Sequence, residues 1–180
     1  WQRYGSRRPR FVIVEPDRAD CLYQSAMHGQ PTEVRITDES IMAGMSCGRV
    51  SDLAWKILCH GTDDFMAIPD ALVPPAMVDL AEGRYGAGPI VAGESAVAAL
   101  AALIVVCRRK ELRNALGLNK QSQVLLYGTE GATDPQIYRQ IVGRSAEDVL
   151  GVCHLEVTEN QRSTFRNVAL PEQNSNNAPF

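Results

Sequence analysis

The sequence has no long apolar run, no paired cysteines and no strongly basic stretch, and each absence excludes a class of protein. Its longest apolar stretch, residues 96–107, is shorter than the roughly 20 residues that a membrane-spanning helix needs. It shows no signal-peptide pattern, so we expect a cytoplasmic location and no membrane partner. The net charge is −3, whereas nucleic-acid-binding proteins concentrate Lys and Arg, so we expect no nucleic-acid partner.

The five cysteines are scattered and match neither a disulfide framework nor a metal site. No two of them form a CxxC pair, and no histidine lies at the spacing of a metal ligand. We expect them to be reduced and mostly buried, and we expect no metal. Residues 86–88 lack the third glycine of GxGxxG, no P-loop is present, and Ser46 and Ser95 have no nearby histidine pattern. A dinucleotide site and a serine hydrolase are therefore not expected.

What is present is an ordinary globular composition, with 45% hydrophobic and 22% charged residues. A length of 180 residues suits one compact domain. We expect residues 1–150 to form an α/β unit and residues 151–180, which are polar and rich in Asn, to form a poorly ordered tail. The arginines within residues 3–10 precede the first apolar run, and we interpret them as a solvated lead-in in preference to an anion site.

Strand and helix patterns alternate along residues 1–150, as in α/β proteins. Strands are predicted at residues 11–14, 34–37, 65–68 and 124–127. Helices are predicted at residues 19–28, 52–59, 70–83, 95–108, 111–116 and 135–142. Asp17 is expected to cap the first of these helices. The helix at 95–108 is apolar on all sides, which places it at the centre of the fold.

Ligands of α/β proteins collect where strand carboxyl ends and helix amino ends meet, and three loops have that position. They are Ala43-Gly44-Met45, Ala92-Gly93-Glu94-Ser95 and Gly128-Thr129-Glu130-Gly131. Glu94 and Ser95 either cap the following helix or line a buried ligand site. Thr129 and Glu130 are either turn residues or polar groups aimed at a ligand. The other polar candidates are interpreted as helix-end residues: His28, His60 and Asp134.

Four motifs, in their order and spacing, resemble the diaminopropionate ammonia-lyases. They are VEPDRADC at residues 14–21, IMAGMSCG at 41–48, GES at 93–95 and VLLYGTEGATDP at 124–135. The resemblance covers roughly residues 11–142. It implies part of the tryptophan-synthase-beta-like fold of pyridoxal phosphate enzymes, a mostly parallel sheet flanked by helices, and a homodimer. It also implies a small amino-acid substrate, 2,3-diaminopropionate, which undergoes α,β-elimination to pyruvate and ammonia.

The resemblance implies that the cofactor is pyridoxal phosphate and indicates which residues bind it. These are Glu94 and Ser95, near the cofactor ring, and Gly128 and Thr129, near its pyridine nitrogen. Ala43 and Gly44 would form the substrate or pocket loop. Relatives often place a serine hydroxyl where this chain has Gly128, so Thr129 or a backbone group would have to substitute. Ala96 likewise replaces a glycine that is expected after Glu94-Ser95.

In the family that the chain resembles, the lysine that holds the cofactor and the glycine-rich phosphate loop lie in segments before the matched region. Lys56, Lys110 and Lys120 lack that lysine's context, so we assign no catalytic residue. We expect a carboxy-terminal portion that is inactive without an amino-terminal half, its expected partner. Two alternatives stay open. One is a serine or threonine dehydratase-like lyase of the same fold, and the other is a non-catalytic binding module on this scaffold.

Overall fold

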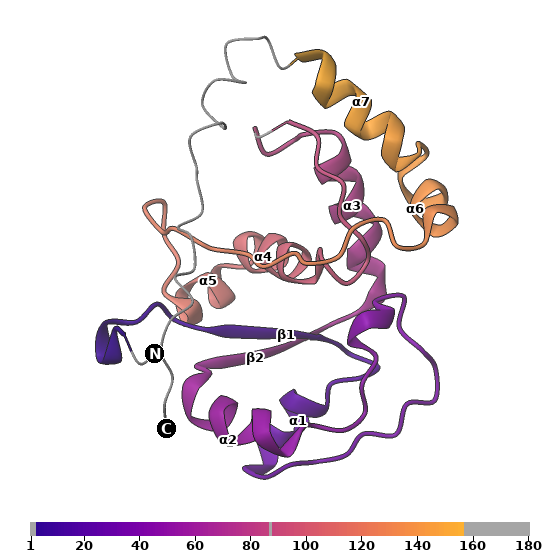
Figure 1. The fold of residues 1–180 in the computed structure, drawn as a ribbon. Helices are drawn as coiled ribbons and strands as arrows, with labels where there is room; N and C mark the ends of the chain where they lie inside the picture. Colours follow the sequence, from indigo (N-terminus) through magenta and orange to yellow (C-terminus); the bar gives the residue numbers. More distant parts are fainter. Residues whose placement is uncertain (1–2, 87, 157–180) are drawn as a thin grey trace, which may run out of the picture.

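A pair of parallel strands lies at the centre of the computed structural model, which describes residues 3–86 and 88–156 (Figure 1). Strand β1 (Val12–Pro16) pairs with β2 (Asp64–Ile68) in a register that joins Val12 to Asp64 and Pro16 to Ile68. Both strands were predicted, and both are confirmed within two residues. Parallel strands need a long crossover, which here contains the helices α1 (Cys21–His28) and α2 (Asp52–Gly61).

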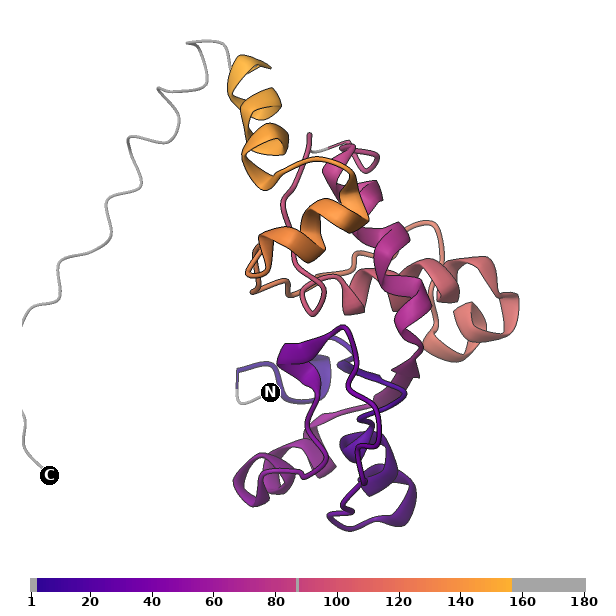
Figure 2. The same cartoon turned by 90° about the vertical axis from the view of Figure 1, so that its right-hand side faces the viewer.

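Helices cover both faces of the strand pair. Helix α4 contacts both strands, and α1 contacts β2. Figures 1 and 2 show α1 and α2 on one side of the strands and the later helices on the other. These later helices are α3 (Val73–Ala81), α4 (Ala98–Arg108), α5 (Lys110–Leu116), α6 (Pro135–Val142) and α7 (Ala146–Glu156). Short 3₁₀ helices form at Gly5–Arg7, Ala43–Met45 and Asp70–Leu72. The layered α/β fold that was predicted is confirmed.

Most of the buried apolar side chains form one core between the strands and helices α3, α4 and α6. Its fully buried members include Met42, Val73, Met77, Val97 and Tyr138. A smaller cluster of Cys21, Val50 and Trp55 lies between α1 and α2. Helix α4 buries Ala98, Ala101, Ala102 and Val106, so the prediction that it is central is confirmed. Small alanine side chains let α4 lie close to the strands.

Side chains close in sequence cap the amino ends of two helices, α2 and α6. Ser51 caps α2, because its side chain accepts a hydrogen bond from the Ala54 backbone N–H at 3.4 Å. Asp134 Oδ1 accepts from the N–H groups of Gln136 and Ile137 at 2.9 and 3.0 Å, and Pro135 occupies the first turn of α6. These side chains satisfy donors that have no partner inside their helix.

The first helix is capped from a distance, and not by Asp17 as predicted. Glu15, at the end of β1, accepts hydrogen bonds from the N–H groups of Leu22 and Tyr23 at 3.0 and 2.8 Å. Its side chain is 7% exposed, and burial raises its pKa although these two donors act to lower it. Glu15 therefore fastens α1 to the strand pair. Sequence spacing did not predict this cap, because Glu15 lies six residues before the helix and a local cap directly precedes its helix.

Two predicted strands are absent from the described residues. Residues 34–37 form no strand, although the Val34 N–H donates to the Gly48 carbonyl at 2.8 Å. Residues 124–127 likewise form no strand and make no backbone hydrogen bond to the other described residues. Their side chains are 47%, 75%, 37% and 73% exposed, so the prediction of a strand here is wrong. No other strand lies beside residues 124–127 in the described part of the chain, where β1 and β2 form the one sheet.

Helix α7 was not predicted, and it crosses the boundary that we expected at residue 150. The predicted tail from residue 157 onward lies outside the described residues, and so do the side chains of residues 152–156. Cys21, Cys47, Cys59 and Cys107 are free, as expected. Cys47 and Cys107 are exposed, which corrects the expectation that the cysteines are mostly buried.

The arginine-rich lead-in is tied to the start of β2. Arg8 donates two hydrogen bonds to Asp63, at 2.5 and 2.9 Å, and Arg10 donates two to Asp64, at 2.5 and 2.8 Å. The Arg8 guanidinium holds the pKa of Asp63 at about 2. Two of the lead-in arginines are therefore paired and not simply solvated. Within residues 3–86 and 88–156, no helix has the length and apolarity needed to cross a membrane.

Candidate functional site

The three loops that the sequence singled out meet in space. The Gly44 N–H donates to Ser95 Oγ at 3.2 Å, which joins the first loop to the second. The Gly93 N–H donates to the Glu130 carbonyl at 3.1 Å, and the Ser95 N–H donates to Glu130 Oε2 at 2.7 Å, which joins the second to the third. Segments that are 35 to 51 residues apart thus form one surface, which we call the three-loop wall: residues 43–45, 92–95 and 128–131.

Gly93 permits the close approach of the second and third loops. A Cβ atom at this position would overlap the Gly131 carbonyl oxygen and would lie 2.9 Å from the Glu130 side chain. Any side chain at residue 93 would therefore push residues 128–131 away. Gly44 is similar but less crowded, since a Cβ there would lie 3.1 Å from Ser95 Oγ. Both glycines hold the wall together by leaving room for their neighbours.

The two positions where the chain departs from the resembled family face each other. A Cβ at Gly128 would lie 3.2 Å from the Ala96 carbonyl oxygen and 3.6 Å from the Ala96 methyl carbon. A side chain at residue 128 would therefore crowd Ala96. The alanine at 96 and the glycine at 128 are thus compatible as a pair, and no hydroxyl is available at residue 128.

Glu94 is the most deeply buried charged group of the wall. Its side chain is 5% exposed, and its Oε1 atom has no hydrogen-bond partner in the described part of the protein. Burial raises the pKa of Glu94, and the negative charges of Glu130 and Asp134 raise it further. A backbone N–H acts to lower this pKa, but the Oε1 atom is left without a partner. A buried carboxyl oxygen without a partner is costly for the chain itself, so Glu94 is a strong candidate for a ligand contact.

Glu94 and Ser95 do not cap the following helix, which was the alternative interpretation of their sequence position. Helix α4 begins at Ala98, and Val97, its N-cap residue, makes no side-chain cap. Ser95 instead contacts Gly44 and Glu130. The structure therefore favours the interpretation that Glu94 and Ser95 line a site.

The other predicted site residues lie at the rim of the wall. Ala43, Gly44, Gly128 and Thr129 are all exposed, so they are accessible to a ligand or to another polypeptide. Glu130 is partly buried, and its Oε1 atom accepts a hydrogen bond from Thr133 Oγ1 at 3.2 Å. It therefore serves chiefly to connect the loops. That these residues bind a cofactor stays a prediction.

Sequence reasoning missed the contacts that fix the pocket loop. Asp70, just after β2, accepts a hydrogen bond from Ser40 Oγ at 2.5 Å and another from the Ile41 N–H at 3.1 Å. Ser40 Oγ in turn accepts from the Met42 N–H at 3.0 Å. The loop at 43–45 is thereby anchored to the end of the central strand pair. No local pattern could show this, because Ser40 and Asp70 are 30 residues apart.

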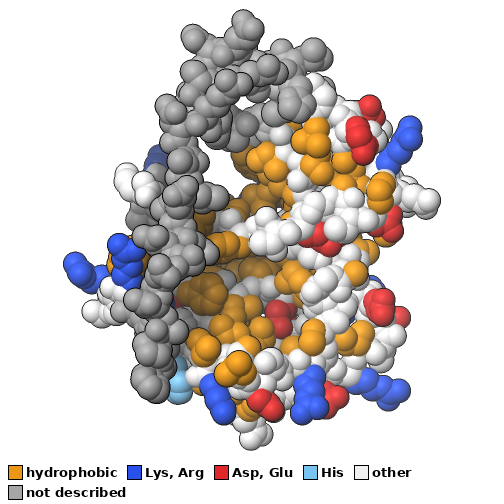
Figure 3. Space-filling model, in the orientation of Figure 1, with side chains coloured by type: hydrophobic (Ala, Val, Ile, Leu, Met, Phe, Trp, Pro, Cys, Tyr) orange, Lys and Arg blue, Asp and Glu red, His pale blue; other side chains and the backbone are white. Residues whose placement is uncertain are grey.

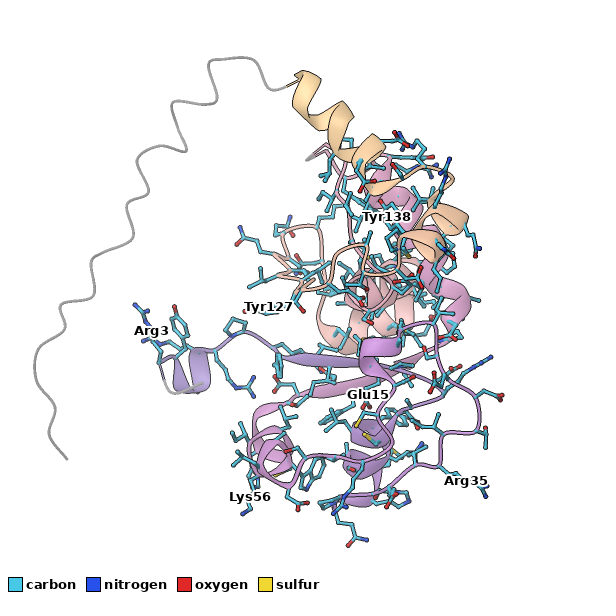
Figure 4. The ribbon with its side chains drawn as sticks, turned by 45° about the vertical axis from the view of Figure 1, so that its right-hand side comes forward. Arg3, Glu15, Arg35, Lys56, Tyr127 and Tyr138 are labelled. Atoms are coloured by element: carbon cyan, nitrogen blue, oxygen red, sulfur yellow. The ribbon has the colours of Figure 1, made fainter. Side chains whose placement is uncertain are left out.

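Tyr138, on α6, is a buried polar residue that the sequence patterns did not single out. It is 1% exposed, and its hydroxyl has no partner among the described residues. Its N–H donates to the Asp134 carbonyl at 2.9 Å, so it lies one turn beyond that residue. Figure 4 labels Tyr138 and Tyr127 in the half of the molecule beyond the strands and Lys56 at the opposite end.

None of the three lysines belongs to the three-loop wall. Lys56 lies on α2, Lys110 begins α5 and Lys120 follows α5, and all three are exposed. The wall instead carries carboxylates, and none of the ion pairs found in the described residues involves Glu94, Glu130 or Asp134. In the described part of the chain, no group of three His, Cys, Asp or Glu side chains could hold a metal ion.

Comparison with known proteins assigns the class. The family model described as "Pyridoxal-phosphate dependent enzyme" matches residues 2–129, so the chain belongs to that family. It is 37% identical over 143 residues to the diaminopropionate ammonia-lyase of Escherichia coli K12. That match covers 77% of this chain and 36% of the relative, so the chain spans little more than a third of the relative's length.

Solved structures agree with this assignment. The crystal structure of Escherichia coli diaminopropionate ammonia-lyase in complex with D-serine aligns with a TM-score of 0.69 at 36% identity, over 79% of this chain and 36% of that one. The structure of maize serine racemase aligns with a TM-score of 0.56 at 20% identity, over 73% of this chain and 38% of that one, which shows the shared fold alone. The predicted fold of pyridoxal phosphate enzymes is thereby confirmed.

Proposed function

We propose that this chain forms one wall of the active site of a pyridoxal-phosphate-dependent ammonia-lyase that acts on 2,3-diaminopropionate. The meeting of three separate loops at Ser95 and Glu130 carries the proposal. The 37% identity to diaminopropionate ammonia-lyase supports this substrate over that of a serine or threonine dehydratase-like enzyme.

The wall suits one part of the cofactor better than another. Its exposed turn at residues 128–131 fits the pyridine nitrogen, which can hydrogen-bond to backbone, and the buried carboxyl of Glu94 would lie on the ring side of the site. The phosphate is an anion and would be repelled by Glu94, Glu130 and Asp134. We therefore propose that residues 94, 95, 128 and 129 contact the ring side and that the phosphate is held elsewhere.

Each wall residue has a limited role in the proposed reaction. When bound, pyridoxal phosphate would accept electrons from the substrate's α-carbon, so that the α-proton can leave and the β-amino group can be expelled. Ser95 and Glu130 fix the relative positions of the loops. Gly93 keeps the second and third loops in contact, and Glu94 places a buried carboxyl on the ring side of the site. None of these groups is the amine that holds the cofactor aldehyde.

We propose that a further polypeptide segment supplies the cofactor-binding lysine and the phosphate contacts. The exposed positions of Lys56, Lys110 and Lys120, outside the three-loop wall, support this proposal. The unpaired, exposed run at residues 124–127 supports it as well, because an extended chain with free backbone groups accepts another strand. Figure 3 shows further hydrophobic side chains gathered over the middle of one face.

We also propose that the working enzyme is a homodimer, and exposed apolar surface favours association. Light scattering of the purified chain should show oligomers. A stable monomer at high concentration would contradict this part of the proposal.

An assay of pyruvate formation tests the proposed function. The chain is mixed with pyridoxal phosphate and either 2,3-diaminopropionate or serine, with and without the part of the Escherichia coli enzyme that the chain does not match. We expect no pyruvate from the chain alone and faster pyruvate formation from diaminopropionate once the second polypeptide is present. Equal rates from serine would favour the dehydratase-like alternative. A tight complex that forms no pyruvate would favour the non-catalytic module.

A further inference from the structure

Glu94 lacks the cation that a buried carboxylate needs. Its side chain is 5% exposed, and Oε1 has no hydrogen-bond partner in the part of the chain that the structure describes. A buried carboxylate is normally paired with a cation or else takes up a proton. The free Oε1 atom is therefore an acceptor for a group that the described residues do not supply.

The charged groups that act on Glu94 in the described part of the protein are the carboxylates of Glu130 and Asp134. Glu130 is held by N–H and O–H donors from Ser95 and Thr133, and Asp134 by N–H donors of α6. The charges of Glu130 and Asp134 both act on Glu94. The arginines in the described ion pairs lie at other places: Arg8, Arg10, Arg18 and Arg84.

We propose that the buried carboxyl of Glu94 binds the second, β-ammonium group of a diamino acid and that Glu130 and Asp134 strengthen this binding through their charge. The inference rests on the proposed function and deepens it, because it names the residue that distinguishes 2,3-diaminopropionate from serine. The two substrates have the same carbon skeleton. They differ in carrying a cationic amino group or a neutral hydroxyl group at the β-carbon.

The geometry favours an ammonium group over a metal ion. A metal ion requires several ligand atoms that converge on one point. No three acidic, histidine or cysteine side chains of the described residues are arranged in that way. An ammonium group requires one good acceptor and a negative surrounding field, and Glu94 with its two acidic neighbours provides both. A neutral hydroxyl gains much less from that field.

Ligand binding tests the inference without relying on turnover. Binding of 2,3-diaminopropionate and of serine is measured by NMR titration of the labelled full chain, with pyridoxal phosphate and the part of the Escherichia coli enzyme that the chain does not match both present. The cofactor-binding lysine of that part is replaced by alanine, so that no substrate turns over. The wild-type chain should prefer diaminopropionate by roughly 10- to 100-fold, the range expected for a hydrogen bond between charged groups. Glu94→Gln, which keeps the size of the side chain, should reduce the preference to about threefold or less. The matched control is Glu111→Gln on the exposed surface of α5, which should keep the full preference.

The wild-type chain offers a second readout that does not depend on the folding of a variant. With ¹³C-labelled glutamate, the Glu94 carboxyl signal should shift on addition of diaminopropionate and not on addition of serine. Equal binding of both amino acids, with no selective shift of that signal, would overturn the inference and leave the proposed cofactor site standing. If neither amino acid perturbs any residue of the three-loop wall, the proposed function fails and the inference fails with it.

Discussion

Some apolar, β-forming segments of this chain form buried, paired strands, whereas another stays unpaired and exposed. The runs at 12–16 and 64–68 pair as β1 and β2 and are half-buried or buried between α1 and α4. The run at 124–127 is equally rich in β-forming residues, yet it stays unpaired and exposed. A strand therefore needs a free neighbouring edge and cover on its faces as well as a suitable sequence. The second run lacks a neighbouring strand among the described residues.

The largest expected difference is in the free energy of unfolding when one large apolar side chain of each segment is cut back to alanine. Ile68 is 3% exposed in β2, and Leu125 is 75% exposed in the unpaired run. Ile68→Ala should lower the free energy of unfolding by about 3 kcal/mol, because it leaves a cavity in the core. Leu125→Ala should change it by less than about 0.5 kcal/mol. Urea unfolding followed by circular dichroism measures both, and comparable losses would show that residues 124–127 are packed in the chain.

Removing the Glu15 cap of α1 should give the second-largest loss in the free energy of unfolding. Glu15→Ala leaves the N–H groups of Leu22 and Tyr23 without acceptors and should lower the free energy of unfolding by about 2 kcal/mol. Glu15→Gln keeps one acceptor oxygen and should cost about half as much. Exposed Glu33 provides the matched control as Glu33→Ala. Thermal unfolding tests the series, and an unchanged midpoint for Glu15→Ala would refute the capping role.

The turn after the unpaired run is anchored at Gly93, which allows a sharper test. A methyl group at residue 93 overlaps the Gly131 carbonyl oxygen, whereas a Cβ at Gly131 has no neighbour within 4 Å. Gly93→Ala should therefore cost 1 to 2 kcal/mol or more by displacing residues 128–131, in the range of overpacking effects of about 1–3 kcal/mol. Gly131→Ala should be nearly neutral. Hydrogen exchange should speed up at the backbone N–H groups of residue 93 and Ser95 in the first variant only.

The smallest expected effect concerns the pH dependence of Glu94. Burial, and then the charges of Glu130 and Asp134, raise the pKa of Glu94 above its ordinary value of 4.5. The folded state therefore favours the protonated carboxyl. This stabilisation is fully present below the pKa of Glu94 in the unfolded chain, and it is lost as the pH rises through the higher pKa of the folded state. At pH 7 the free energy of unfolding of Glu94→Gln should exceed that of wild type by about 1 kcal/mol, and the difference should close at low pH.

A parallel pH series with Glu111→Gln provides the control, because Glu111 is exposed on α5 and should show no such difference. If Glu94→Gln instead destabilises the chain at pH 7, Glu94 has a favourable partner inside the protein. That result would remove the reason to seek one in a ligand.

The sequence predicted elements well wherever the deciding interactions are local. Ser51 and Asp134 cap helices within three residues, so their roles could be predicted from spacing. The expectation that loops between strand carboxyl ends and helix amino ends converge also predicted which three loops come together. Distant contacts could not be predicted, since Glu15 caps a helix across a loop and Asp70 anchors a serine 30 residues away. The exposure of residues 124–127 depends on a missing neighbour, which local composition does not reveal.

The central claim is that this chain supplies one wall of a pyridoxal phosphate site without supplying the lysine. The most direct measurement adds pyridoxal phosphate to the purified chain, reduces the mixture with borohydride and maps the modified lysines by mass spectrometry. The account predicts slow, nonspecific labelling spread over Lys56, Lys110 and Lys120, with no violet absorbance that is characteristic of a lysine-bound cofactor. A single lysine that is labelled stoichiometrically, with that absorbance, would contradict it.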